Sequence, residues 1–220
     1  CLVVSPLLAL MQDQVENLKR IGIKATTIHS GMPYSEIQQK LNLCISGYYK
    51  FLYVSPERLS SPYFGERLQS MNICLLVVDE AHCISQWGYD FRPSYLKISE
   101  LREMYPDVPI LALTASATPD VVTDIKEKLS FRDDNNMFQA SVERNNLYYV
   151  VRQTDNKDAQ LFKILTAVGG SAIVYTRTRD GAEKVAKMLQ SMEFSADYYH
   201  AGLEGYERRK RQNSWMQGET

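Results

Sequence analysis

The sequence has little net charge, no long apolar run and few cysteines. Its formal net charge is −1, so no global basic field indicates nucleic acid, although a local basic groove is sufficient to bind it. The longest apolar run is far too short to cross a bilayer, and no charged-then-apolar leader opens the chain. We therefore expect neither a membrane partner nor secretion.

The four cysteines stand at positions 1, 44, 74 and 83, and no two of them form a CxxC pair. Because Cys44 and Cys74 lie within apolar runs, we expect buried free thiols in a reducing compartment rather than disulfides. Cys1 already belongs to an apolar strand pattern and no Met precedes it, so the sequence is interpreted as an excerpt whose first element is cut.

A phosphate loop is also missing. The motif GxxxxGK[ST] lets backbone N–H groups and a lysine cradle the phosphates of a nucleotide. These 220 residues contain no Gly-Lys pair and no lysine followed by serine or threonine. The excerpt by itself is therefore expected to be inactive as a nucleotide hydrolase.

What is present is an alternation of short β-branched runs with helical patterns. Strands are expected at 1–4, 25–29, 51–55, 73–78 and 110–114, and after a polar stretch at 130–137 again at 146–151, 172–176 and 196–200. Helices are expected from about Leu8, Ser35, Pro119, Asp155, Thr178 and Glu204. Fully apolar strands alternating with helices indicate a parallel sheet covered on both faces.

The two series of elements are related by a shift of 171 positions. The shift places residues 1–32 over 172–203 without a gap, and it aligns Ser5 with Thr176 and His29 with His200. The shared order of strand, hydroxyl-bearing turn, helix, strand and His-x-Gly favours two copies of one α/β unit that meet near residues 139–145. Adjacent sheets of this kind create a cleft where α/β proteins place ligands.

Two adjacent acids, Asp79 and Glu80, follow the apolar run Ile73–Val78. An aspartate at the carboxyl end of a strand can hold Mg²⁺, often through water, and the next acid can orient or deprotonate the water that attacks a γ-phosphate. The alternative is a purely structural role, in which the acid pair at the strand end caps a turn. Zinc at Asp79, His82 and Cys83 is a third possibility, but no second Cys/His pair stands at ligand spacing.

The motifs "DEAH" at 79–82 and "TASAT" at 114–118 resemble the ATPase core of superfamily 2 helicases. The segment "CISQWGYDFRPSY" between them is similar to the aromatic-rich loop of the RecQ DNA helicases, and the other RecQ motifs stand in the family's order. The resemblance implies an α/β fold of two RecA-like units with parallel sheets flanked by helices, both incomplete. Residues 1–140 would be the first unit without its phosphate-loop part, and 141–220 the start of the second.

The resemblance implies catalytic roles for Asp79, Glu80 and His82, with ATP and Mg²⁺ as cofactors and Asp79 as the magnesium residue. Aromatic side chains stack on bases of any identity, and arginine adds phosphate or cation–π contacts. From composition alone, Trp87, Phe91 and Tyr95 could equally well pack a long turn. The resemblance favours a role in coupling DNA to ATP, in a set that includes the "TASAT" hydroxyls: Trp87, Tyr89, Phe91, Arg92, Thr114, Ser116 and Thr118. RecQ proteins often carry histidine at position 89, and tyrosine cannot become cationic near neutral pH.

Weaker matches concern DNA contacts, namely Ser5, Pro6, Ser55, Arg58, Thr176, Arg177, His200 and Gly202. For Ser5, Pro6, Ser55 and Arg58, turn chemistry is a strong alternative explanation, and Thr118 can equally cap the helix that begins near Pro119. The basic run 208–211 is more typical of a solvated helix face than of a nucleic-acid patch.

The function implied by the resemblance is an ATP-dependent 3′–5′ DNA helicase that moves along single strands and unwinds partly duplex DNA in recombination and repair. Such a protein works in the cytoplasm at the nucleoid of a bacterium, or in a eukaryotic nucleus. The alternatives are a non-enzymatic module that binds single strands or a partner, and a DEAH-type RNA helicase. The sequence leaves protein partners unassigned.

Overall fold

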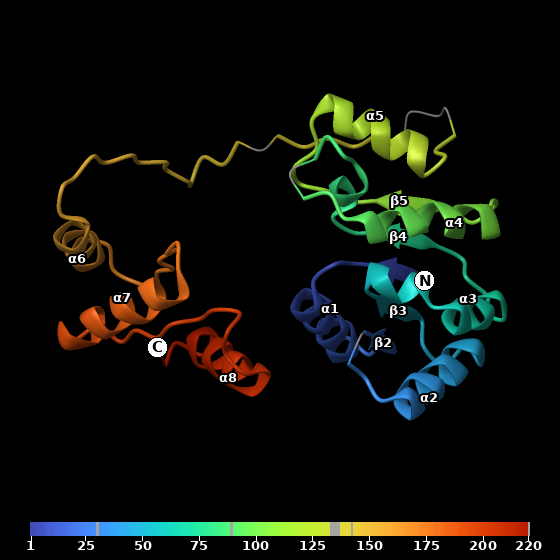
Figure 1. Cartoon of the computed structure of the whole chain (residues 1–220), viewed down its shortest axis with the longest axis horizontal. Helices are drawn as coiled ribbons and strands as arrows, with labels where there is room; N and C mark the ends of the chain where they lie inside the picture. The colour runs from blue at the N-terminus through green and yellow to red at the C-terminus, as the bar shows by residue number, and fades with distance from the viewer. Residues whose placement is uncertain (30, 89, 133–136, 142, 220) are drawn as a thin grey trace. The chain divides into compact units, whose positions relative to one another are not determined.

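The computed structural model describes residues 1–29, 31–88, 90–132, 137–141 and 143–219. The chain divides into two compact units, Cys1–Gln139 (unit 1) and Ala140–Thr220 (unit 2). Figure 1 shows both units. No helix in these described ranges is long and apolar enough to cross a membrane.

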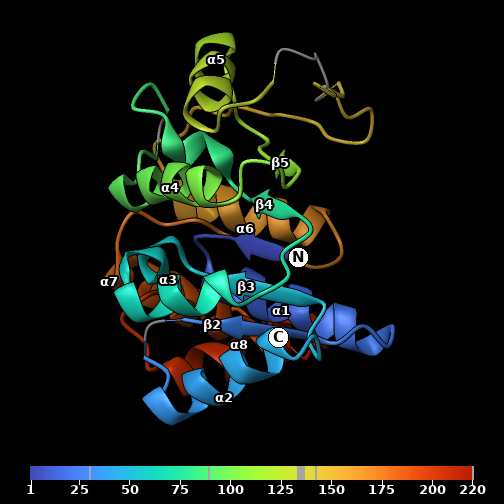
Figure 2. The same ribbon diagram turned by 90° about the vertical axis from the view of Figure 1, so that its right-hand side faces the viewer.

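Unit 1 is built on a five-stranded parallel sheet, in the order β2-β3-β1-β4-β5. Figure 2 shows the strands stacked in this order, from β2 at the bottom to β5 at the top. The strands are β1 (Leu2–Val4), β2 (Ala25–Ile28), β3 (Phe51–Val54), β4 (Leu76–Val78) and β5 (Ile110–Ala112). All five strands predicted for this part of the chain are therefore formed. β4 begins three residues later than expected.

Helices cover both faces of this sheet, as the continuous apolar strands predicted. On one face, α1 (Leu8–Arg20) packs Met11 and Val15 against Val3 and Tyr53. The other face carries α2 (Tyr34–Ile45), α3 (Pro62–Gln69), α4 (Lys97–Met104) and α5 (Pro119–Lys128). Alternate strand residues point to opposite faces, so Leu2 and Val4 belong to the second core and Val3 to the first.

Several short elements were not predicted from the sequence. They are α3, α4 and three single-turn 3₁₀ helices at Pro56–Ser60, Ala81–Ile84 and Pro93–Leu96. Each of the two α-helices has eight residues and buries only two apolar side chains in its span, which is too short a pattern to stand out in a sequence window. The helix expected from about Ser35 is confirmed, and Gly47 behind it has the left-handed φ of +75° that favours glycine.

All four cysteines are free, as expected. The prediction of burial was wrong for Cys74, which is exposed. The reason is that β4 begins only at Leu76, so Cys74 precedes the sheet instead of lying in it.

Unit 2 contains three helices in its described residues: α6 (Lys157–Ala167), α7 (Arg179–Ser191) and α8 (Gly205–Met216). They begin close to the predicted positions, and Asn156 and Thr178 cap the first two by accepting hydrogen bonds from backbone N–H groups at 3.0 Å. The three strands expected at 146–151, 172–176 and 196–200 are not formed in the described part of unit 2.

A strand is formed only where a neighbouring strand completes its hydrogen bonds. In unit 1, β1 and β2 are not neighbours, because β3 lies between them and pairs with both. The shift of 171 carries β1 and β2 onto 173–175 and 196–199, and in the described part of unit 2 neither segment is paired with a strand.

A core substitution tests the packing of unit 1. Leu41 on α2 is fully buried, so Leu41→Ala should lower the free energy of unfolding by about 2–5 kcal/mol. The matched control is Leu8→Ala in the first turn of α1, where the leucine is exposed, and it should change stability by about 0.5 kcal/mol or less. Urea unfolding followed by circular dichroism compares the two, and equal losses would contradict this description of the core.

Candidate functional site

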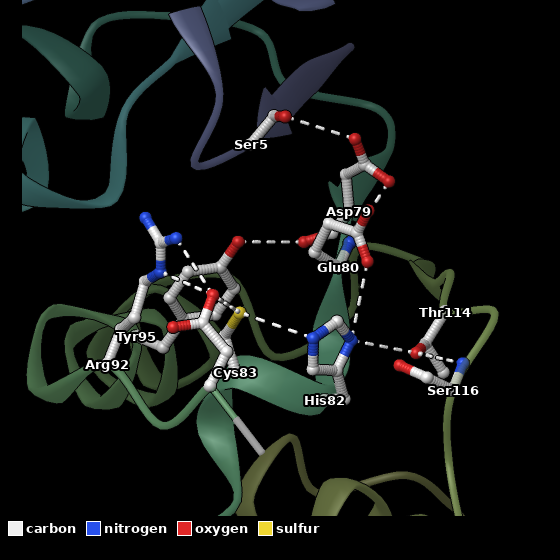
Figure 3. Close-up of polar contacts among 10 residues, drawn as sticks. Ser5, Asp79, Glu80, His82, Cys83, Arg92, Tyr95, Thr114 and Ser116 are labelled. Carbon is white, nitrogen blue, oxygen red and sulfur yellow. Dashed lines mark hydrogen bonds and ion pairs between the residues drawn. The ribbon is translucent and has the colours of Figure 1, made fainter. Parts of the chain in front are cut away.

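The carboxyl edge of the sheet collects polar side chains from several strands. Ser5 follows β1, Ser55 follows β3, Asp79 follows β4, and Thr114 comes two residues after β5. Because all the strands are parallel, these positions meet at one edge of the sheet. Figure 3 shows the network that results around Asp79 and His82.

The Asp79 carboxylate is held between β1 and β4. Its Oδ2 accepts a hydrogen bond from the Ser5 hydroxyl at 3.0 Å, and its Oδ1 accepts one from the Glu80 backbone N–H at 3.0 Å (Figure 3). The Asp79 N–H donates to the Val4 carbonyl at 2.9 Å and so extends the strand pairing. Ser5 is 1% exposed, so its hydroxyl serves Asp79 from inside the protein.

Glu80 makes a sharp turn directly after the strand. Its φ of 48° and ψ of 45° lie in the left-handed region, a conformation that costs of order 1–3 kcal/mol for a residue with a side chain. The turn brings the Glu80 carboxylate to His82, with 3.3 Å between Oε2 and Nδ1. A strained residue beside Asp79 marks this turn as a site where geometry matters more than local stability.

His82 connects the acid pair to the segment after β5. Its Nδ1 lies 3.0 Å from the Thr114 hydroxyl, which also accepts a hydrogen bond from the Ser116 N–H at 3.3 Å (Figure 3). The Ala81 N–H donates to the Leu113 carbonyl at 2.9 Å, so backbone contacts reinforce the link. The "DEAH" and "TASAT" motifs are therefore physically joined.

Cys83 and Asp90 lie on the other side of the His82 ring. The Cys83 sulfur is 3.7 Å from His82 Nε2 and 3.8 Å from Asp90 Oδ2. Burial, followed by the negative charge of Asp90, raises the pKa of the Cys83 thiol to about 11, so the thiol is protonated at neutral pH. Asp79, predicted as a possible zinc ligand together with His82 and Cys83, faces Ser5 instead. The carboxylate that lies beside the Cys83 sulfur is that of Asp90.

Arg92 is paired with Asp90 inside the aromatic-rich loop. Both its Nε and its Nη2 donate to Asp90 Oδ2, at 3.1 and 2.8 Å. These hydrogen bonds lower the pKa of Asp90 and raise that of Arg92. Sequence reasoning named Arg92 but missed Asp90, although an acid two residues from an arginine is a visible signal for such a pair.

The aromatic residues of this loop have different environments. Trp87 is 80% exposed, Phe91 is half-buried, and Tyr95 is fully buried with its hydroxyl donating to the Asp79 carbonyl at 2.9 Å. The alternative that the aromatics only pack a turn therefore fits Tyr95 and does not fit Trp87. Tyr89 lies outside the described residues.

The other residues named from the sequence have mixed surroundings. In unit 1, Pro6 is half-buried, Ser55 is buried, and Arg58 Nη2 donates to the His29 carbonyl at 2.9 Å. Thr118 caps α5, with its hydroxyl accepting from the Val121 N–H at 3.5 Å. In unit 2, Arg177 is exposed, and the Thr176 hydroxyl donates a hydrogen bond to the Thr178 carbonyl. His200 Nε2 lies 3.3 Å from Glu183 Oε1, and Gly202 lies against the Arg179 side chain.

The model of the DEAD/DEAH box helicase family matches residues 1–125, and the chain belongs to this family. Within it, the chain is 40% identical to the ATP-dependent DNA helicase RecQ of Bacillus subtilis over 99% of its own length and 37% of the relative. It is 39% identical to the RecQ helicase of Haemophilus influenzae over 92% of its length and 33% of the relative. The resemblance to RecQ helicases is thereby confirmed, and the chain spans well under half of these relatives.

A solved structure supports the fold class. The structure of Mycobacterium smegmatis helicase Lhr bound to ssDNA and AMP-PNP aligns with 99% of this chain and 32% of its own chain, with a TM-score of 0.63 and 18% identity. At that identity the likeness concerns the fold alone. The predicted RecA-like α/β class is confirmed by this likeness and by the parallel sheet of unit 1.

Gly88 fixes how the loop leaves the 3₁₀ turn. A Cβ at this position would lie 2.8 Å from the His82 carbonyl oxygen and 3.3 Å from that of Ser85. Gly88→Ala should therefore destabilise unit 1 by about 1–3 kcal/mol, as overpacking does. Gly65→Ala in α3 is the control: nothing lies within 4 Å of its Cβ, and alanine should stabilise the helix by up to about 1 kcal/mol. Unfolding midpoints that shift in the same direction would contradict this geometry.

Proposed function

We propose that this chain supplies the hydrolytic acids and the DNA-sensing loop of an ATP-dependent DNA helicase of RecQ type. The observation that carries the proposal is the placement of Asp79 and Glu80 at the carboxyl edge of a parallel sheet, bonded on one side to Ser5 and on the other to His82. Unit 1 is then part of the first RecA-like helicase domain, and unit 2 is the beginning of the second.

Asp79 suits a magnesium ion that is held through water. Each of its carboxylate oxygens accepts one hydrogen bond from the protein, which leaves further lone pairs for water molecules. The two bonds also fix the direction of the carboxylate. Mg²⁺ keeps several waters and takes much of its coordination from substrate phosphates, so it would screen the developing charge of ATP at this edge.

Glu80 is placed to handle the attacking water. One Glu80 carboxylate oxygen contacts His82, and among the described residues no hydrogen bond is made to the other oxygen, so that oxygen is open to a water molecule. The left-handed turn holds the side chain at the sheet edge. His82 links that carboxylate to the Thr114 hydroxyl, which also accepts a hydrogen bond from the Ser116 N–H. Movement of the "TASAT" segment therefore shifts the group that orients the water.

The exposed Trp87 and the Asp90-bound Arg92 suit a loop that detects single-stranded DNA. An indole that is 80% exposed is available for base stacking, which contributes about 1–3 kcal/mol per base. The same loop reaches the Asp79 backbone through buried Tyr95. DNA bound on the loop can therefore change the position of the acids without touching the nucleotide.

Further residues are proposed to contact DNA in each unit. They are Pro6, Ser55 and Arg58 in unit 1, and Thr176, Arg177, His200 and Gly202 in unit 2. Their support is the RecQ resemblance of their motifs. Single-stranded and partly duplex DNA are the proposed substrates, with 3′–5′ movement. Unwinding assays on matched DNA and RNA duplexes with overhangs of either polarity test the substrate and the direction together.

Substitution of the second acid tests the hydrolytic site in the full-length protein that contains these residues. Glu80→Gln keeps the shape but removes the base, so ATP binding should persist while turnover falls at least about 10²-fold. Glu100→Gln on α4 removes an exposed acid paired with Lys97 and should leave turnover unchanged. DNA-stimulated ATP hydrolysis is the measurement, and near-normal turnover by Glu80→Gln would refute the assignment.

Substitution of the loop tests DNA sensing separately. Trp87→Ala and Arg92→Ala should keep basal ATP hydrolysis and lose much of its stimulation by single-stranded DNA, because Arg92 bonds to Asp90 and neither side chain is bonded directly to Asp79 or Glu80. Trp87→Phe preserves a stacking face and should recover part of the stimulation. Arg132→Ala, at an exposed arginine paired with Asp107, controls for loss of positive charge. Equal loss of the basal and stimulated rates would show that the loop is structural.

A further inference from the structure

His82, Cys83 and Asp90 place three different metal-ligating atoms within 4.8 Å of one another. The Cys83 sulfur lies 3.7 Å from His82 Nε2 and 3.8 Å from Asp90 Oδ2. Two of the residues belong to the 3₁₀ turn Ala81–Ile84, and the third lies in the aromatic-rich loop. The cluster is distinct from Asp79, whose carboxylate faces Ser5 on the other side of the turn (Figure 3).

Two of the three distances within this cluster are close to those of a zinc site. Tetrahedral Zn²⁺ with one sulfur, one nitrogen and one oxygen ligand at their usual bond lengths separates the ligand atoms by about 3.3–3.6 Å. The two distances around the Cys83 sulfur exceed that range by only a few tenths of an ångström. The ligand atoms of His82 and Asp90 lie within 4.8 Å, so the exposed Asp90 side chain must rotate toward the ring to close the three atoms around an ion.

The orientation of His82 also fits metal ligation. Its Nδ1 lies 3.3 Å from Glu80 Oε2 and 3.0 Å from the Thr114 hydroxyl. A carboxylate at Nδ1 favours the tautomer with the proton there, so the Nε2 lone pair is on the side of the ring that contacts the Cys83 sulfur. A histidine that donates one ring N–H to a carboxylate and ligates through the other nitrogen is the usual arrangement at protein zinc sites.

Arg92 is the natural competitor for this site. Both of its donors go to Asp90 Oδ2, the carboxylate oxygen that faces the Cys83 sulfur. The Asp90 side chain is 54% exposed, so water can reach it and occupy a fourth coordination position. A metal cation and the guanidinium would share one oxygen and repel each other.

We propose that His82 Nε2, Cys83 Sγ and Asp90 Oδ2 form a binding site for a thiophilic divalent cation of the Zn²⁺ class, in competition with Arg92. Binding exchanges the Cys83 thiol proton, released to solvent, for a sulfur–metal bond, and it involves no change of oxidation state. The bound ion joins the "DEAH" turn to the aromatic-rich loop and releases the Arg92 guanidinium from Asp90. The proposal is independent of the proposed ATP hydrolysis.

Cobalt titration of the reduced, chelator-treated 220-residue chain tests this site. Co²⁺ reports a thiolate ligand by a ligand-to-metal charge-transfer band and tetrahedral geometry by intense visible bands. We expect both signals to saturate at one equivalent and to disappear when Zn²⁺ is added. A spectrum typical of octahedral Co²⁺ without the charge-transfer band would overturn the proposal.

Paired variants identify the ligands. Cys83→Ser should abolish the charge-transfer band, whereas Cys74→Ser, at the exposed cysteine, should leave it unchanged. Asp90→Asn should weaken the metal about tenfold or more, and Arg92→Ala should tighten it because the competing cation is gone. Both residues lie near the surface, so these two variants remain informative if Cys83→Ser fails to fold. A band that follows Cys74, or affinities that change in the same direction in Asp90→Asn and Arg92→Ala, would refute the site.

Discussion

The parallel pairing of β1 with β4 is the constraint on which the rest of the site depends. The register places Val4 opposite Val78, so Ser5 and Asp79 leave the sheet side by side. The Ser5–Asp79 hydrogen bond then joins two residues that are 74 positions apart in the chain. A hydrogen bond to a charged group contributes about 1.5–3 kcal/mol, and here it also fixes the direction of the acid. If the register slipped by one residue, Asp79 would lose its contacts with the Ser5 hydroxyl and the Val4 carbonyl.

The His82 ring makes contacts on two opposite sides. On one side, His82 is bonded to Glu80 and Thr114, which connects the turn to the segment after β5. On the other side, the same ring contacts Cys83, which contacts Asp90 and through it Arg92. One imidazole ring therefore touches the proposed hydrolytic group and the proposed DNA-sensing loop. The proposed hydrolytic group and the proposed DNA-sensing loop can therefore be coupled through this single ring.

The sequence was sufficient to predict the sheet of unit 1 and the position of the acid pair. Continuous apolar strands such as Leu76–Val78 identify themselves because both faces of a parallel sheet are buried. Sequence patterns failed for α3 and α4, which are short, and for Cys74, whose apolar neighbours do not belong to a strand. They also failed in unit 2, where Val174 has a strand pattern but pairs with no strand among the described residues.

The class of the protein could be assigned from the sequence alone, because the residues of "DEAH", "TASAT" and the aromatic-rich loop are read directly along the chain. Which of those residues touch one another became clear only in the folded structure. Asp79 binds Ser5 instead of joining His82 and Cys83, and Asp90 becomes their neighbour although it was not predicted to join them. The physical reason is that hydrogen bonds and metal ligation act over a few ångströms. Separations of that size depend on strand register and on the left-handed turn at Glu80, and spacing along the chain does not encode them.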